Sequence, residues 1–216
     1  MADEYHELPL FPLNTVLFPH MNLPLRIFEP RYRQMLSYSM EHDQTFGIVL
    51  IKMGSEVGEL ATPYEIGTIA RIVNSDTMED GTIGVITVGD RRFQIESILQ
   101  ERPFPMARIF YPNEDATPID DAEFQEIRTL GRKCLNHLMA LNHQWSRDVD
   151  LPNDQEKFSY ILPTRLQQLD NRIRQILLES PTLATRLGDE RTILEEEEKK
   201  LHDLLLQEAW MSPNQN

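Results

Sequence analysis

The sequence predicts an α+β protein, with a β-rich first half curled into a barrel-like sheet and a helical second half. Three observations support this prediction. Short apolar runs separated by prolines, glycines and polar turns fill the chain up to residue 111, and a polar, proline-bounded stretch follows at 112–119. Beyond it, apolar residues recur at three- and four-residue spacing. We therefore expect a β-rich domain at 1–111, a linker at 112–119, a helical bundle at 120–210 and a disordered tail at 211–216.

The first apolar runs carry prolines. Leu8–Leu13 and Thr15–Phe18 are each interrupted or bounded by proline, which cannot donate a hydrogen bond to a neighbouring strand. They are predicted to be edge strands or short arms, and Leu23–Phe28 another extended piece. The apolar period then becomes helical, and Pro30 suits the first turn of a helix, so a helix is predicted over about 30–41.

The next segments read as strands joined by tight turns. Asp80-Gly81 lies between two apolar runs and tolerates the positive φ that a hairpin needs. The predicted strands are Phe46–Ile51, Thr68–Val73, Thr82–Val88, Arg92–Ile98 and Met106–Tyr111. Six or more short strands leave unpaired edges in a flat sheet, so a curled sheet is expected.

Three or four helices are predicted in the second half. The first begins at Asp120 or Asp121 as N-cap, the second periodic stretch runs from Phe158 to Leu177 with a division near Pro163, and the last covers about 181–208. In the last helix, leucines recur every seven residues from Leu187. Glutamates occupy the positions that would complete a coiled-coil seam, so an amphipathic bundle helix is expected instead.

Composition excludes several classes of function. The 216 residues include 21 basic and 35 acidic ones, a net charge of −14, which disfavours binding to nucleic acid or to anionic membranes. The single cysteine, Cys134, allows no intrachain disulfide and no thiolate zinc site. No apolar run approaches the ~20 residues that span a bilayer, and the acidic start is unlike a signal peptide. A cytoplasmic protein is expected.

No catalytic constellation stands out. The sequence has no Gly-x-Ser-x-Gly elbow, no P-loop and no His-Glu-x-x-His pair. Cys134 falls on the apolar face of a predicted helix, where a thiol is usually inert. His137 and His143 are six residues apart and face different ways on a helix, and the other histidines are scattered. We expect no enzyme activity, no metal and no cofactor.

One structural ion pair is predicted. Glu29 and Arg31 flank the start of the first helix beside aromatic residues, where a carboxylate is costly to bury without a partner. Glu29 is expected to accept hydrogen bonds from Arg92 or Arg31 and so to tie the helix start to the sheet. The alternative reading is that these are unrelated surface charges.

Ordered motifs in the first half carry a family resemblance. The stretch Leu8–Met35, then Gly67–Ile72, Asp80-Gly81 and Gly89–Phe93 resemble the substrate-binding amino-terminal domain of Lon proteases. The resemblance implies a PUA-like pseudobarrel followed by a helical bundle, and capture of unfolded or degron-bearing polypeptide. The Walker A loop and Ser-Lys dyad of Lon proteases do not occur here, so the chain resembles stand-alone Lon-domain proteins.

The function expected from this resemblance is a non-enzymatic polypeptide-binding module that acts as an adaptor for a separate protease or chaperone. Met21, Phe28, Tyr32 and Met35 are candidate peptide-binding residues, because methionine side chains adapt to varied partners, although ordinary core packing is the stronger explanation for each residue taken singly. The rival readings are an RNA-binding PUA-like protein and an enzyme of unknown type with a perturbed carboxylate in a cleft. The oligomeric state is left open.

Overall fold

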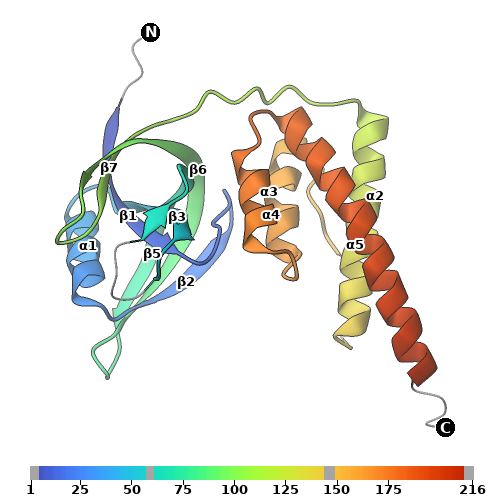
Figure 1. The fold of residues 1–216 in the computed structure, drawn as a ribbon, viewed down its shortest axis with the longest axis horizontal. Helices are drawn as coiled ribbons and strands as arrows, with labels where there is room; N and C mark the ends of the chain where they lie inside the picture. The colour runs from blue at the N-terminus through green and yellow to red at the C-terminus, as the bar shows by residue number, and fades with distance from the viewer. Residues whose placement is uncertain (1–4, 57–60, 144–148, 212–216) are drawn as a thin grey trace. The chain divides into compact units, whose positions relative to one another are not determined.

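The protein consists of two compact units. A computed structural model describes residues 5–56, 61–143 and 149–211, and Figure 1 shows its fold. The first unit is the chain up to Asn113 together with Leu169–Glu179, and the second is Glu114–Gln168 together with the chain from Ser180 onward. The first unit holds a closed sheet and the second holds helices, which confirms the predicted α+β class.

The first unit is a pseudobarrel. Its sheet has the order β1-β7-β6-β5-β3, and β1 pairs again with β3, which closes the sheet on itself. The short β4 pairs with β3, and β2 pairs with β6. The strands are β1 His6–Leu13, β2 Asn22–Ile27, β3 Thr45–Met53, β4 Thr62–Pro63, β5 Ile66–Thr77, β6 Ile83–Gln100 and β7 Met106–Phe110.

The prediction that Leu8–Leu13 forms an edge strand is wrong. The first part of β1 pairs antiparallel with β7 and its second part pairs parallel with β3, so β1 closes the barrel. Each part is paired on one side only. A proline can therefore occupy either part without removing a hydrogen bond from the sheet, and Pro9 and Pro12 lie opposite Met106 and Val49.

Two further expectations about the strands need correction. Thr15–Phe18 forms no strand, although Val16, Leu17 and Phe18 are buried in this irregular segment. The two predicted strands at 82–88 and 92–98 are one continuous strand, β6. Its Gly89 exchanges backbone hydrogen bonds with His20 and Met21, so the irregular segment is held against the sheet by its main chain.

Local signals located the first helix and the hairpin correctly. Helix α1 spans Pro30–Glu41, with proline in its first turn. At the hairpin tip Gly81 has φ of +78°, and the Asp80 carboxylate accepts the backbone N–H of Thr82. Helix α1 packs on one of the two apolar clusters of the barrel. The buried members of that cluster include Phe11, Leu17, Ile27, Tyr32, Met35, Phe46, Ile48, Val85 and Phe104.

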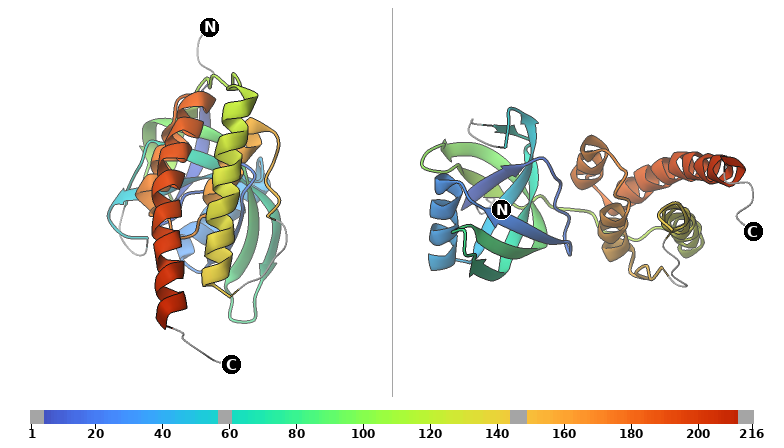
Figure 2. Two further views of the ribbon diagram at one scale, coloured as in Figure 1. Left: turned by 90° about the vertical axis from the view of Figure 1, so that its right-hand side faces the viewer. Right: turned by 90° about the horizontal axis from the view of Figure 1, so that it is seen from below.

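In its described residues the second unit contains three helices, α2 Asp121–Leu141, α3 Gln155–Arg165 and α5 Leu183–Met211. As predicted, Asp120 caps α2, and its carboxylate accepts the N–H groups of Ala122 and Glu123. Helices α2 and α5 lie side by side and run in the same direction (Figures 1 and 2). The heptad leucines of α5 are fully buried in this unit, Leu187, Leu194 and Leu201. The predicted tail beyond Met211 lies outside the described residues.

Helix α4, Asn171–Glu179, belongs to the barrel unit and not to the helical bundle, so the division of the chain differs from the predicted linear split. The Gln175 amide donates to the Ile66 carbonyl oxygen at 2.9 Å, and Arg92 of β6 donates to the Leu178 carbonyl oxygen at 2.6 Å. The division predicted near Pro163 falls instead at residues 166–170, between the end of α3 and the start of α4. Pro163 itself lies inside α3.

The helical unit buries an ionic cluster. Arg186 of α5 is 0% exposed, and its Nη2 donates to the Glu114 carboxylate at 2.6 Å. Its Nε donates to the Ser159 hydroxyl at 2.9 Å, and its guanidinium lies over the Tyr160 ring, 4.0 Å from the centroid. Arg186 therefore joins α5 to α3 and to the segment that precedes α2. Within the described residues, no helix combines the length and hydropathy needed to cross a bilayer.

Candidate functional site

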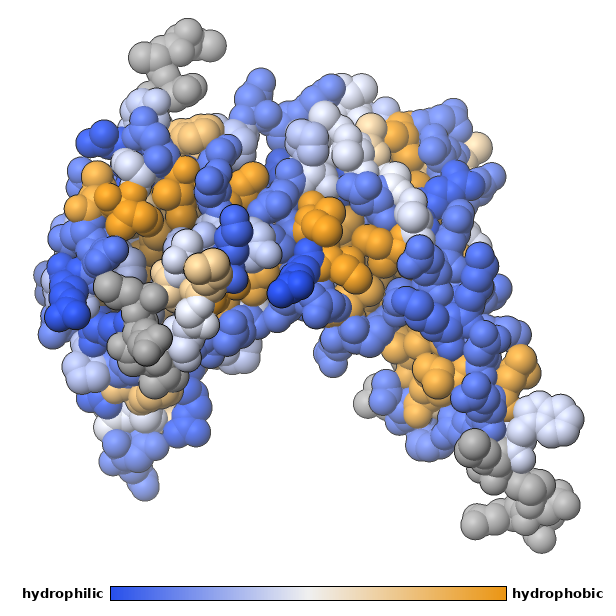
Figure 3. Space-filling model, viewed as in Figure 1, coloured by the Kyte–Doolittle hydropathy of each residue, from blue (hydrophilic) through white to orange (hydrophobic). Residues whose placement is uncertain are grey.

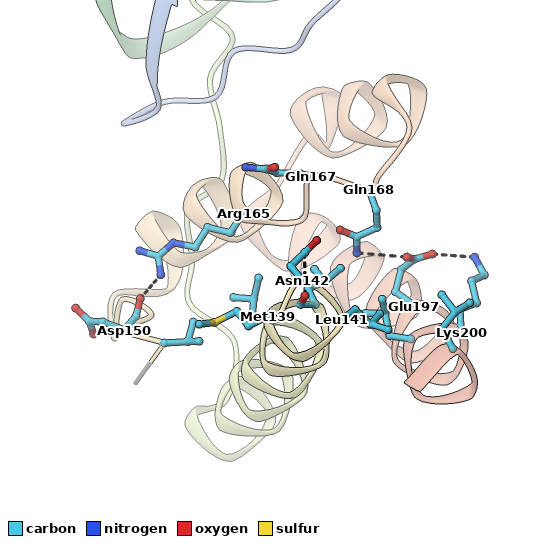
Figure 4. A pocket seen from close by; sticks show the side chains of 14 residues that line it. Met139, Leu141, Asn142, Asp150, Arg165, Gln167, Gln168, Glu197 and Lys200 are labelled. Atoms are coloured by element: carbon cyan, nitrogen blue, oxygen red, sulfur yellow. Dashed lines mark hydrogen bonds and ion pairs between the residues drawn. The ribbon is translucent and has the colours of Figure 1, made fainter. Parts of the chain in front are cut away.

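A hollow with a volume of about 1020 Å³ lies within the helical unit (Figure 4). We call it the helical groove. It is lined by the C-terminal half of α2, the segment that precedes α3, the end of α3 with the turn after it, and the C-terminal part of α5. The lining residues are Leu135, Leu138, Met139, Leu141, Asn142, Val149, Asp150, Arg165, Gln167, Gln168, Glu197, Lys200, Leu201 and Leu204.

Apolar side chains form the deeper part of the helical groove. Leu135, Val149 and Leu201 are buried, while Leu204 is 49% exposed at its edge. The hydropathy surface shows hydrophobic residues gathered around the C-terminal ends of α2 and α5 (Figure 3). Exposed leucines in a partly enclosed hollow leave apolar surface in contact with water, which a bound apolar group would cover.

Polar side chains surround the leucines. The Gln168 amide donates to Glu197 at 3.4 Å, and Lys200 pairs with the other oxygen of Glu197 at 2.8 Å (Figure 4). Elsewhere on the groove, Arg165 donates to the Asp150 carbonyl oxygen at 2.5 Å. Amide and carboxylate groups of this kind can hydrogen-bond to a peptide backbone or to polar side chains.

The lining of the groove, as far as the structure describes it, contains no histidine, serine, threonine or cysteine side chain. The ammonium of Lys200 and the carboxylate of Glu197 are paired with each other at 2.8 Å. Cys134, one turn before Leu138 on α2, is buried, and its thiol contacts the Leu194 carbonyl oxygen at 3.4 Å. Burial raises the pKa of this thiol to about 12, which keeps it protonated and inert, in agreement with the sequence prediction.

The four candidate peptide-binding residues of the barrel unit do not share one surface. Tyr32 and Met35 are 3% and 0% exposed in the core cluster beside Phe11 and Phe46, because α1 turns its apolar stripe toward the sheet. Burial also raises the pKa of Tyr32 to about 12. Met21 is half-buried against the same cluster. Phe28 is 52% exposed and is the member of this set that presents a large apolar surface.

The predicted ion-pair residues are placed as follows. Arg31 Nε donates to Glu29 Oε2 at 3.0 Å, and both side chains are mostly buried at the start of α1. Arg31 also donates to the Glu56 carbonyl oxygen and lies over the Tyr32 ring. The hydrogen bond of Arg92 to Leu178 ties the sheet to α4 instead of to the start of α1.

Sequence reasoning did not single out the helical groove. One signal was available, since Leu204-Leu-Leu206 is an apolar run in an otherwise strongly charged helix. A helix with a single buried stripe does not need three consecutive leucines. Leu204 and Leu206 are accordingly 49% and 47% exposed.

Comparisons with known proteins show which family shares this architecture. The family model of the ATP-dependent protease La (LON) substrate-binding domain matches residues 7–196. A Lon protease of Brevibacillus choshinensis is 28% identical over 89% of the chain, and one of Cytophaga hutchinsonii is 25% identical over 67%. The chain spans 26% and 18% of the length of these two curated relatives.

A solved structure agrees with the fold. The crystal structure of a Lon N-terminal domain protein from Xanthomonas campestris superposes with a TM-score of 0.62 at 23% identity, covering 85% of this chain and 95% of that one. The likeness extends over both the barrel and helical parts of the chain. By the match over residues 7–196, the chain belongs to the LON substrate-binding domain family.

Proposed function

We propose that this chain is a polypeptide-binding module that recognises exposed apolar segments of unfolded or degron-bearing polypeptides in its helical groove. The observation that carries the proposal is a leucine-lined hollow with polar groups around it, in a domain whose family is described by substrate binding. A groove of about 1020 Å³ has room for several side chains of a bound segment.

The residues of the groove suit varied peptides. Met139 and the neighbouring leucines can repack around apolar side chains of different shapes. Asn142, Gln167 and Gln168 carry amides that both donate and accept hydrogen bonds, as a peptide backbone requires. The net charge of −14 disfavours acidic clients and favours segments that combine apolar and basic residues.

We further propose that the chain acts as an adaptor, presenting its clients to a separate protease or chaperone. The described lining of the groove has no histidine, serine, threonine or cysteine, so we assign binding to this chain and the cleavage of what it holds to another protein. We place this activity in the cytoplasm, where a single buried thiol such as Cys134 stays reduced.

The test is a binding measurement with a permanently unfolded probe. Fluorescein-labelled lysozyme, a basic protein that is kept unfolded by reduction and alkylation with iodoacetamide, is titrated with the protein, and the Kd is read from fluorescence anisotropy. Leu204→Glu places a charge at the edge of the groove and should weaken binding by about tenfold or more. The substitution is at a half-exposed position, so the fold should be kept.

Leu206→Glu is the matched control, because Leu206 is equally exposed on α5 and does not line the groove. Its Kd should equal that of the parent protein. Phe28→Ser tests the barrel surface instead. Equal losses at positions 204 and 206, or a loss confined to Phe28→Ser, would refute the helical groove as the binding site.

A further inference from the structure

Three metal-ligating side chains converge in the helical unit, outside the residues that line the groove. His137 comes from α2, and Glu198 and His202 come from α5, where their four-residue spacing places them on one helix face. One ligand atom of each lies within 4.8 Å of the others. His137 Nδ1 is 3.9 Å from Glu198 Oε1, and the rings of His137 and His202 are 5.8 Å apart between centroids.

The Nδ1 atom of His137 is available to bind a metal ion. This atom is buried and makes no hydrogen bond within the described residues. A buried ring nitrogen without a partner is unfavourable, and a metal ion would satisfy it.

The donor set indicates the class of ion. Two imidazoles and one carboxylate suit Zn²⁺ and similar divalent transition metals, and three protein ligands leave the fourth position to water. A tetrahedral Zn²⁺ with bonds of about 2.1 Å holds its donor atoms about 3.4 Å apart. Separations of up to 4.8 Å between ligand atoms therefore need to shorten by at most about 1.4 Å, and rotation of the exposed His202 can supply part of this change.

Lys133 competes for the site. Its ammonium lies 2.7 Å from Glu198 Oε1, so the carboxylate is already paired. A metal ion at Glu198 must displace this lysine, and its positive charge opposes the arriving cation. The side chain of Lys133 is 57% exposed and can swing into solvent.

We propose that His137, Glu198 and His202 bind a divalent transition-metal ion, with Zn²⁺ as the best-suited ion, and that this ion links α2 to α5. The two helices pack together through their side chains, so a metal bound to both stabilises their pairing. The groove leucines of α2 and α5 are placed by that same pairing.

The experiment uses the full chain without an affinity tag, stripped with EDTA and dialysed. Zn²⁺ is titrated by calorimetry, and Co²⁺ serves as a spectroscopic probe through its visible absorption. One equivalent of metal should bind and should raise Tm. His137→Ala and His202→Ala should each weaken binding by about a hundredfold. His202 is exposed, so its replacement leaves the fold of the metal-free protein intact.

His143→Ala is the matched control, because His143 is an exposed histidine near the end of α2 that pairs with Glu208 and not with the three ligands. It should bind Zn²⁺ as the parent does. Lys133→Met should tighten binding, because it frees Glu198. Failure to bind Zn²⁺, equal affinity in the His143 and His202 variants, or no gain in Lys133→Met would overturn the proposal.

Discussion

The barrel unit and the helical unit are held together by different interactions. In the barrel, neighbouring strands satisfy one another's backbone groups, and the closed sheet surrounds clusters of apolar side chains. In the helical unit, each helix satisfies its own backbone, and the buried interior contains Arg186 and Glu190, which are 0% and 2% exposed. The placement of helices therefore depends on individual side chains, and the placement of strands depends on the main chain.

This difference predicts which kinds of substitution destabilise each unit. A barrel closed by paired strands tolerates the loss of single polar side chains, but it cannot tolerate added atoms where two backbones meet. A helical unit joined through a buried guanidinium loses the connection between helices when that one group is removed. Three substitutions, taken in order of expected effect, test this contrast.

The largest effect is expected for Arg186→Ala. It removes one partner of the Glu114 carboxylate, which also accepts from the Tyr160 hydroxyl, and one partner of the Ser159 hydroxyl, and it leaves a cavity beside the Tyr160 ring. The free energy of unfolding of the helical unit should fall by about 3–5 kcal/mol. Amide hydrogen exchange followed by mass spectrometry should show faster exchange in α2 and α5, with β5 and β6 unchanged.

Arg191→Ala on the same helix is its control. Arg191 is 42% exposed and pairs with Glu195 at 3.2 Å, so its loss should cost less than about 1 kcal/mol. If the two arginine variants lose equal stability, or if the strands exchange as fast as the helices after Arg186→Ala, the contrast between the units is wrong.

The second substitution, Gly89→Ala, acts on the barrel. A Cβ at this position would lie 2.1 Å from the backbone oxygen of Phe18, where the irregular segment crosses β6. The main chain must shift to admit it, at a cost of about 2–3 kcal/mol. Unfolding in urea followed by circular dichroism measures this loss.

Gly84→Ala is the matched change on the same strand. Its Cβ would meet the flexible end of the Met78 side chain at 2.9 Å, which can move aside. Its effect should stay within about 1 kcal/mol. A similar loss in both alanine variants would show that β6 needs glycine for its flexibility and not for the close approach at Phe18.

Local signals in the sequence predicted the parts of the fold that depend on neighbouring residues. The helix from Pro30, the turn at Asp80-Gly81 and the cap at Asp120 each follow from residues within a few positions of one another. The position of α4 cannot be read from neighbouring residues. It depends on hydrogen bonds from Gln175 to Ile66 and from Arg92 to Leu178, whose partners are about 90 to 110 positions apart in the sequence.

The positions of the candidate site residues also depend on contacts between residues that are far apart in the sequence. Tyr32 and Met35 were chosen for their residue type, but the direction of α1 relative to the sheet decides that they are buried. The convergence of His137 with Glu198 and His202 needs the pairing of α2 with α5, which the heptad leucines indicate only in outline. The spacing of His137 and His143 describes one helix, whereas Glu198 and His202, the potential ligands near His137, lie on another helix, α5.

The smallest and most specific effect concerns Glu190. Both its carboxylate oxygens are buried without a hydrogen-bond partner in the described residues, and burial raises the pKa of Glu190 well above its usual value, with Arg186 opposing this shift and Asp189 adding to it. At pH values between the unfolded pKa and the higher folded pKa, the folded state therefore keeps a proton that the unfolded state has lost. Stability due to this group is full below the unfolded pKa and falls as pH rises toward the folded one, by up to about 1.4 kcal/mol per pH unit.

Glu190→Gln removes this titration, so its free energy of unfolding should decline less than that of the parent from about pH 5 to about pH 7. Urea unfolding at several pH values gives both slopes. Glu195→Gln, at a position with a half-exposed side chain on the same helix, should keep the parent slope. Parallel slopes for the parent and Glu190→Gln would mean that the carboxylate is solvated or paired, and that the helical unit holds no unpartnered buried charge. The barrel and the helical unit would then differ in how their elements are joined, but not in the cost of the groups they bury.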